Sequence, residues 1–173
     1  MEKVIGIDAS TVSTGVAIFK ELKSGEVTLE ETYLLSSNKK SKIADKRKRT
    51  EITEERIAFM ITELEKIFEK YKPSKIIIED IYGGKDMYSL KMLARFQGFV
   101  FGYCVLNNVQ IEYKIANKWR KEVGIPLTDE NKVKYKRKDL KRLAIQKVKE
   151  LYNIDCTEDV ADAICIGYSA FTK

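Results

Sequence analysis

The sequence predicts a mixed α/β domain built on a five-stranded sheet, and three observations support this prediction. The chain has 173 residues, of which 44% are hydrophobic, and this suits one globular domain with a substantial core. Three strand-like segments follow one another at the start of the chain. Helical and strand-like segments then alternate, an order typical of a mixed sheet flanked by helices. We therefore expect residues 1–173 to form a single domain.

The first three strands are predicted from short apolar runs separated by turns of small and polar residues. Their ranges are 4–9, 15–20 and 26–35. The third segment alternates with a period of two, which predicts that its apolar residues share one face. The residues expected on that face are Val27, Leu29, Tyr33 and Leu35.

The later elements are predicted from helical apolar stripes and from two further β-rich runs. Helices are expected at 57–71, 87–105, 117–123, 138–152 and 158–171, and strands at 75–78 and 110–115. The isoleucines of 75–78 predict a strand that is buried on both faces. The basic stretch at 36–49 is interpreted as a solvated loop.

The predicted helix 87–105 is apolar on nearly all sides. One face would carry Leu90, Leu93, Ala94 and Phe101, and another Met92, Phe96, Phe99 and Tyr103. A helix that is apolar on two sides needs two partners. One partner is expected to be the sheet, and the other is either a second subunit or the rest of the same domain. Gly98 and Gly102, four residues apart, would let a neighbouring helix come close.

The composition excludes several classes of site. The chain has no histidine, so neither a histidine base nor a Ser-His or Cys-His nucleophile is available. Its cysteines, Cys104, Cys156 and Cys165, are odd in number and far apart, which argues against zinc and against a disulfide framework, and for a reducing cytoplasm. We expect no signal peptide, no membrane span and no small-molecule cofactor. Any metal must be held by oxygen ligands, which favours Mg²⁺ or Mn²⁺.

Charge is distributed unevenly along the chain. The net charge is +6, yet 39–49 holds seven basic residues and one acid, and 114–149 holds thirteen basic residues and four acids. The rest of the chain is therefore acidic. Two basic segments beside an acidic remainder indicate a polyanion partner held near a carboxylate site, with solvated surface lysines as the alternative. Trp119 and Tyr135 within the second segment favour the polyanion.

Five acids occupy unusual positions in the predicted elements. Asp8 lies inside the first strand, Glu79 and Asp80 follow the buried strand, and Asp159 and Asp162 are three apart on the last helix. Singly, they could be a turn residue, strand-end charges and helix N-terminal charges, although Asp162 lies between apolar neighbours. Together, half-buried acids without histidine need a cation to offset their repulsion. Such a site can hydrolyse a phosphodiester through one or two divalent ions.

The chain resembles the RuvC-type Holliday junction resolvases, which are RNase H-like nucleases. The resemblance rests on three stretches: "IGIDASTVSTGVAIF", "KIIIEDIYGGKDMYSLKMLARFQGFVFGYCV" and "EDVADAICIGY". It implies an RNase H-like mixed five-stranded sheet flanked by helices. It also implies that a homodimer cleaves branched DNA, with three-way junctions considered beside four-way junctions. The implied metal-binding and catalytic acids, which would hold Mg²⁺ with Mn²⁺ as a substitute, are Asp8, Glu79, Asp159 and Asp162, with Asp80 a bystander.

The resemblance departs from the family pattern at 124–137, where a longer charged loop appears. The family's lysine at the start of the next helix has two candidates, Lys138 and Lys141, of which Lys141 fits the spacing better and is the one expected to act in catalysis. A chain with this longer basic loop is similar to the bacteriophage branch of the family, whose selectivity for four-way junctions can be looser. The residues expected to contact DNA are Lys132, Lys134, Arg137, Lys138, Lys141 and Arg142.

Two other functions fit part of the sequence. The stretch around Asp8 also resembles the phosphate loop of actin-like ATPases and sugar kinases, but those folds use two related domains. A non-catalytic nucleic-acid-binding module would explain the basic segments but would leave Asp8, Glu79 and Asp162 unexplained. The expected function is therefore metal-dependent cleavage of branched DNA in DNA recombination or phage DNA processing, in the cytoplasm of a prokaryotic cell or a phage-infected host.

Overall fold

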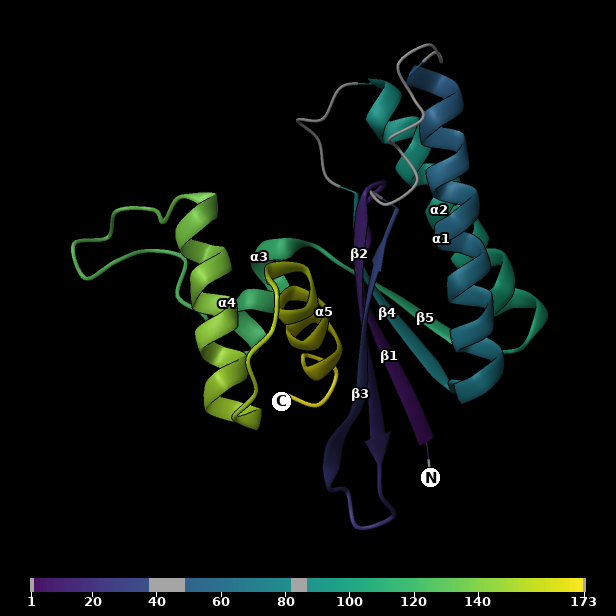
Figure 1. Ribbon diagram of the computed structural model, residues 1–173. Helices are drawn as coiled ribbons and strands as arrows, with labels where there is room; N and C mark the ends of the chain where they lie inside the picture. Colours follow the sequence, from purple (N-terminus) through teal and green to yellow (C-terminus); the bar gives the residue numbers. More distant parts are fainter. Residues whose placement is uncertain (1, 38–48, 82–86, 173) are drawn as a thin grey trace.

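The computed structural model shows a five-stranded mixed sheet with helices on both faces (Figure 1). It describes residues 2–37, 49–81 and 87–172. The elements are β1 (Glu2–Asp8), β2 (Ser13–Glu21), β3 (Val27–Ser36), α1 (Arg49–Tyr71), β4 (Lys75–Glu79), α2 (Met87–Leu106), β5 (Gln110–Lys114), α3 (Ala116–Glu122), α4 (Arg137–Tyr152) and α5 (Glu158–Tyr168). The stretch 36–49, expected to be a loop, lies outside the described residues except for Ser36, which ends β3, Ser37, and Arg49, which begins α1.

The sheet has the strand order β3-β2-β1-β4-β5. β1 runs antiparallel to β2 and parallel to β4, and β4 runs parallel to β5. This arrangement confirms the predicted mixed sheet, and it places β1 and β4 side by side at the centre. Because parallel strands end at the same edge of a sheet, the last residues of β1 and β4, Asp8 and Glu79, lie at one edge.

Two apolar layers cover the sheet. In Figure 1, α1 and α2 lie on one side of the strands and α3, α4 and α5 on the other. Ile76 and Ile78 pack into the layer with α1 and α2, whereas Ile77 packs into the layer with α5, and all three are fully buried. The prediction that this strand is buried on both faces is confirmed.

The prediction that the apolar residues of β3 share one face is wrong. A bulge interrupts the pairing of β2 and β3, because Ile18 pairs with Glu31 while Phe19 pairs with Leu29. One extra residue in a strand moves the following side chains to the opposite face. Val27 and Leu29 therefore pack with α4 and α5, whereas Tyr33 and Leu35 pack with α1 and α2.

The two predicted faces of α2 need one correction. Leu93 is buried with Met92 and Phe96 rather than lying beside Ala94 and Phe101. The face turned away from the sheet is an exposed stripe that consists of Ala94, Gly98, Phe101 and Val105. No described helix is both long and apolar enough to cross a membrane.

A short hairpin of residues 127–135, here called the arm, connects α3 to α4 in the sequence. It projects outward past α4 (Figure 1). Thr128 and Lys134 pair as an antiparallel bridge. The Asp129 carboxylate accepts hydrogen bonds from the backbone N–H groups of Asn131 (2.9 Å) and Val133 (2.8 Å). The longer loop expected in this region is therefore a structured projection.

Candidate active site

Two strands and one helix bring the four predicted acids to the same edge of the sheet. Asp8 and Glu79 end the neighbouring parallel strands β1 and β4. Asp159 and Asp162 lie in the first two turns of α5, which packs over β1 and β2. The charges of Glu79, Asp159 and Asp162 all act on Asp8. Asp80, expected to be a bystander, instead donates its backbone N–H to the Lys114 carbonyl of β5 (2.9 Å).

Glycine allows α5 to approach the sheet closely enough for this arrangement. Gly15 is the register partner of Asp8 on β2. A Cβ atom at Gly15 would overlap the backbone carbonyl of Asp159, so only glycine fits at this crossing. Gly6 and Gly167 make a similar backbone contact further along the helix. The contact at Gly15 therefore sets the distance between Asp8 and the acids of α5.

Asp162 is the most deeply buried acid of the cluster. It is 3% exposed, and its Oδ1 atom has no hydrogen-bond partner among the described residues. The pKa of Asp162 is raised to about 7, chiefly by burial; Arg120 and Lys141 oppose the shift, and the charges of Glu79 and Asp159 add to it. A buried carboxylate oxygen without a partner is costly, which indicates that a cation or a proton completes its environment.

The pKa of Asp8 is raised by the same two causes, burial and neighbouring negative charge. Burial raises the pKa of Asp8 well above its usual value, and the charges of Asp162, Glu79 and Asp159 add to the effect. Lys141 provides the opposing positive charge. Coupled carboxylates of this kind are typical of functional sites rather than of solvated strand ends.

Sequence reasoning missed two residues of α3 that act on the acids, Trp119 through a hydrogen bond and Arg120 through its charge. The Trp119 indole N–H donates a hydrogen bond to Glu79 Oε2 (2.9 Å) and is fully buried. The Arg120 guanidinium lies over the Trp119 ring, 4.3 Å from its centroid, and lowers the pKa of Asp162. The available signal was a tryptophan inside a basic segment, which pointed only to a polyanion and not to the acids.

The structure distinguishes between the two candidate lysines of α4. Lys141 Nζ lies 3.2 Å from Glu158 Oε2 and 3.3 Å from Asp159 Oδ1. Burial lowers the pKa of Lys141, but its hydrogen bond to Glu158 and the charges of Asp162 and Asp159 outweigh burial and raise it overall. The other basic residues expected to contact DNA are all exposed: Lys132, Lys134, Arg137, Lys138 and Arg142. Only Lys141 of this set is brought to the acids.

The acid cluster fits a divalent cation in its chemistry. Its oxygen donors suit a hard ion, and the unpartnered Oδ1 of Asp162 and the mutual repulsion at Asp8 would both be relieved by positive charge. Among residues 2–37, 49–81 and 87–172, no three acidic or thiol side chains already lie at ligating distances. Glu79 Oε2 accepts a hydrogen bond from Trp119, and Asp159 Oδ1 accepts one from Lys141, so one oxygen of each carboxylate is already engaged.

Without metal, the protein should become less stable as the pH rises from about 4 to about 7. The pKa of Asp162 is about 7 in the folded protein, against 3.8 for an unperturbed carboxyl, so the folded state keeps a proton that the unfolded chain has released. The contribution of this proton to the free energy of unfolding is fully present below pH 3.8 and is lost as the pH rises through 7. It amounts to roughly 2–4 kcal/mol. Urea unfolding in chelator across this range measures the loss.

Asp162→Asn is the matched variant for this measurement. The difference between its pH dependence and that of the unmodified protein reports the titration of Asp162 together with its coupling to Asp8, and removes the contribution of carboxyl groups outside the cluster. Mg²⁺ or Mn²⁺ at pH 8 should raise the unfolding midpoint of the unmodified protein more than that of the variant. Two parallel stability curves, with equal metal effects, would contradict the burial of an unpartnered charge at this position.

Comparison with known sequences shows which family of proteins this chain is similar to. Residues 4–169 match the family described as crossover junction endodeoxyribonuclease RuvC. A protein of that name from Fusobacterium nucleatum is 27% identical over 164 residues, which are 95% of this chain and 77% of that protein. Another from Carboxydothermus hydrogenoformans is 24% identical over 172 residues, 99% of this chain and 96% of that protein.

Solved structures show the same fold. Thermus thermophilus RuvC in complex with a Holliday junction substrate has a TM-score of 0.70 and 12% identity, with 98% of this chain and 93% of that chain covered. The fowlpox virus Holliday junction resolvase has a TM-score of 0.57 and 15% identity, with 97% and 96% covered. The family match extends over nearly the whole chain, so this protein belongs to the RuvC family of crossover junction endodeoxyribonucleases.

Proposed function

We propose that this protein is a metal-dependent endonuclease that nicks branched DNA and resolves four-way junctions in DNA recombination or phage DNA processing. The observation that carries the proposal is the convergence of Asp8, Glu79, Asp159 and Asp162 at one edge of the sheet, in a chain of the RuvC family. Nucleases of this family depend on a metal, and relatives with this fold have been solved with Holliday junction DNA.

The four acids would hold Mg²⁺, with Mn²⁺ as a substitute. When bound, the cation would lower the pKa of the attacking water and stabilise charge on the phosphate. Trp119 orients Glu79 through its indole N–H, and Gly15 sets the position of Asp159. Lys141 Nζ keeps its proton at neutral pH, because its pKa is raised, and so supplies fixed positive charge beside the cluster.

A panel of DNA substrates tests the proposal. Matched linear, flap, three-way and four-way DNAs are incubated with Mg²⁺ or Mn²⁺, and the positions of the nicks are read. We expect paired nicks at the branch of the four-way DNA. Binding of branched DNA without nicking in either metal would favour a non-catalytic module. Thermal stabilisation by nucleotides without nicking would favour the actin-like alternative.

Replacing Lys141 with alanine should reduce cleavage more than it reduces binding. Its ammonium lies 3.3 Å from Asp159 and is half-buried, so it can reach a phosphate held at the acids. We expect the single-turnover nicking rate to fall about 10²-fold, with junction affinity changed by less than about threefold. Lys138→Ala is the control, since Lys138 is exposed on the same helix. Equal losses of rate and affinity for Lys141→Ala would make it a positioning contact only.

We propose that two copies of the chain associate through the exposed stripe of α2. Ala94, Gly98, Phe101 and Val105 recur at helical spacing, and Phe101 and Val105 are 52% and 63% exposed. A Cβ at Gly98 would meet nothing within 4 Å, so another helix has room to approach. Apolar residues at this spacing on an open helical face are typical of helix–helix pairing. A homodimer would present two acid clusters to one junction.

Phe101→Glu should convert the dimer to a monomer, because it places a charge in the centre of the apolar stripe. Sedimentation or light scattering measures the mass at micromolar concentration. Val133→Glu provides the control, since Val133 is 61% exposed on the arm rather than on α2. If Phe101→Glu kept the mass of the unmodified protein, another surface would have to form the dimer.

We infer that the protein acts in the cytoplasm of a prokaryotic cell or of a phage-infected host. Its three cysteines are free, and Cys104 and Cys165 are buried. Free buried thiols suit a reducing compartment.

A further inference from the structure

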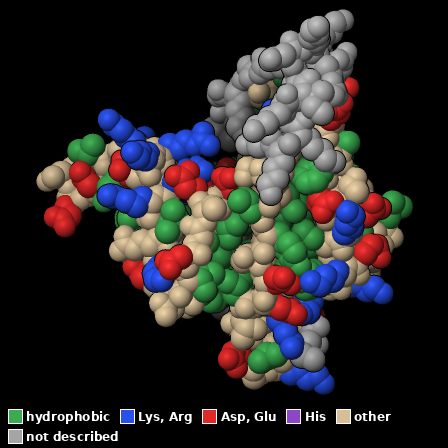
Figure 2. All heavy atoms as spheres, viewed as in Figure 1, with side chains coloured by type: hydrophobic (Ala, Val, Ile, Leu, Met, Phe, Trp, Pro, Cys, Tyr) green, Lys and Arg blue, Asp and Glu red, His purple; other side chains and the backbone are tan. Residues whose placement is uncertain are grey.

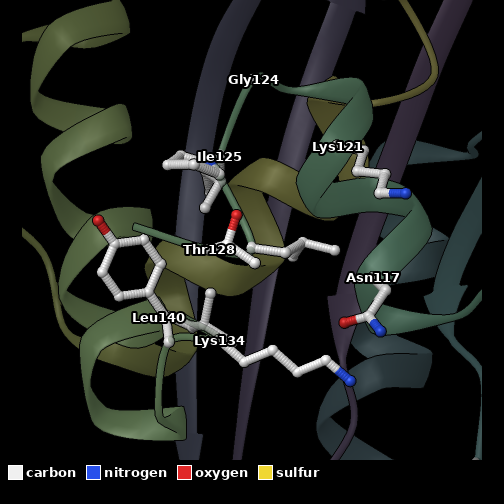
Figure 3. A pocket seen from close by; sticks show the side chains of 10 residues that line it. Asn117, Lys121, Gly124, Ile125, Thr128, Lys134 and Leu140 are labelled. Carbon is white, nitrogen blue, oxygen red and sulfur yellow. The ribbon is translucent and has the colours of Figure 1, made fainter. Parts of the chain in front are cut away.

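A cleft of about 660 Å³ lies between α3, the base of the arm and α4 (Figure 3). Its volume lies in the range of roughly 300–1,000 Å³ that is typical of sites for small ligands. One wall is apolar and includes Ile125, Leu127 and Leu140, with the aromatic ring of Tyr135. The polar lining consists of Asn117, Lys121, Thr128 and Lys134. The cleft therefore combines an apolar wall with two amines.

The polar groups of the cleft are arranged to meet an anion. In Figure 3, the side chains of Asn117, Lys121 and Lys134 extend toward the same side. Neither Lys121 nor Lys134 forms an ion pair with any described residue. The arm that carries Lys134 is held in shape by the Thr128–Lys134 bridge and by the hydrogen bonds to Asp129. The two amines are thus free to bind charge from outside the chain.

The cleft and the acid cluster share two structural elements. On α3, Trp119 and Arg120 face the acids while Asn117 and Lys121 line the cleft. On α4, Lys141 contacts Asp159 while its neighbour Leu140 lines the cleft. A DNA strand that passes the acids would therefore continue along α3 and α4 toward the cleft.

We propose that the cleft binds one unpaired nucleotide of the DNA strand that is cleaved. Lys121 and Lys134 would bind its phosphate, and its base would lie against Tyr135 and the apolar wall. A positive groove with an aromatic side chain is the usual design for single-stranded nucleotides, whereas a stacked duplex cannot enter a concave cleft. The inference rests on the proposed action on branched DNA, where nucleotides at the branch are most easily unpaired.

Binding measurements on matched variants test this site. Lys121→Gln and Thr128→Trp, which fills the cleft from an exposed position, should each weaken binding to a junction with unpaired nucleotides about tenfold. Neither should change affinity for fully paired linear duplex by more than about twofold. Lys118→Gln is the control, because it removes the same charge from an exposed position of α3 outside the cleft. Equal losses for Lys118→Gln and Lys121→Gln would overturn the proposal.

Photocrosslinking locates the nucleotide directly. 5-Iododeoxyuridine is placed at successive positions around the branch, and crosslinked peptides are identified by mass spectrometry. We expect one position near the nick to crosslink within residues 124–140, and Thr128→Trp to abolish that crosslink. No crosslink there at any position would overturn the proposal. Failure of the unmodified protein to bind or nick any branched DNA would instead overturn the proposed function.

Discussion

Asp162→Asn should abolish nicking of four-way DNA while leaving the junction bound. Asp162 is 3% exposed and presents an unpartnered carboxylate oxygen to the cluster, so the amide would remove one anionic ligand without opening a cavity. We expect the single-turnover rate to fall by about 10³-fold or more, which corresponds to about 4 kcal/mol of lost stabilisation of the transition state. Binding should be unchanged or tighter, because negative charge near the DNA is reduced.

The same experiment compares the other acids of the cluster. Asp8→Asn and Glu79→Gln should have similarly large effects, since they end the two central strands. Asp159→Asn should reduce the nicking rate less, because Asp159 is half-buried and already shares Lys141 with Glu158. Asp80→Asn is the control, because its backbone is bonded to β5 instead. Nicking by Asp162→Asn at a rate near that of the unmodified protein would remove Asp162 from the site.

Gly15→Ala should have the second-largest effect, although it removes no charge and no hydrogen bond. The added methyl group would overlap the backbone carbonyl of Asp159, and backbone cannot move aside as a flexible side chain can. We expect the free energy of unfolding to fall by about 3 kcal/mol. The start of α5 would also shift away from Asp8, and a displacement of about 1 Å at a catalytic group can cost about 10²-fold in rate.

Gly25→Ala separates this steric effect from ordinary glycine replacement. Gly25 has a φ of +83° and open space around its Cβ position, far from the acids. Alanine there should cost about 1 kcal/mol of stability and leave the nicking rate unchanged. Urea unfolding and single-turnover nicking, both at low temperature, give the two quantities for each variant. A full nicking rate in a folded Gly15→Ala protein would show that the contact does not position α5.

The elements of this fold could be predicted from the sequence wherever one local signal decides them. The isoleucines of β4 and the apolar stripes of the helices gave elements close to those observed, except that α1 begins at Arg49 and not at residue 57. The face exchange within β3 could not be predicted, because a bulge opposite Ile18 and Phe19 depends on the pairing of two strands. Alternation along one strand carries no information about its partner.

The candidate site, like the fold, could be predicted only in part from the sequence. Five acids could be singled out because carboxylates beside apolar segments are unusual in any sequence, and the family resemblance then narrowed the predicted ligands to four by setting Asp80 aside. Trp119 and Arg120 could not be assigned to them, since α3 reaches Glu79 and Asp162 only through the tertiary fold. Lys141 and Lys138 are equally basic in sequence, and the rotation of α4 decides which of them faces Asp159. The same rotation decides that Leu140 lines the cleft beside the arm.

The hydrogen bond between Trp119 and Glu79 makes the acid cluster observable by intrinsic fluorescence. Trp119 is the single tryptophan of the chain, so indole emission excited at the red edge comes from one ring. That ring donates to Glu79 Oε2 at 2.9 Å and lies under the Arg120 guanidinium. Any event that turns Glu79 or moves α3 would change the polarity around the indole and shift its emission. Cation entry and DNA docking can therefore be timed optically in the unlabelled protein, in a stopped-flow instrument, before any strand is cut.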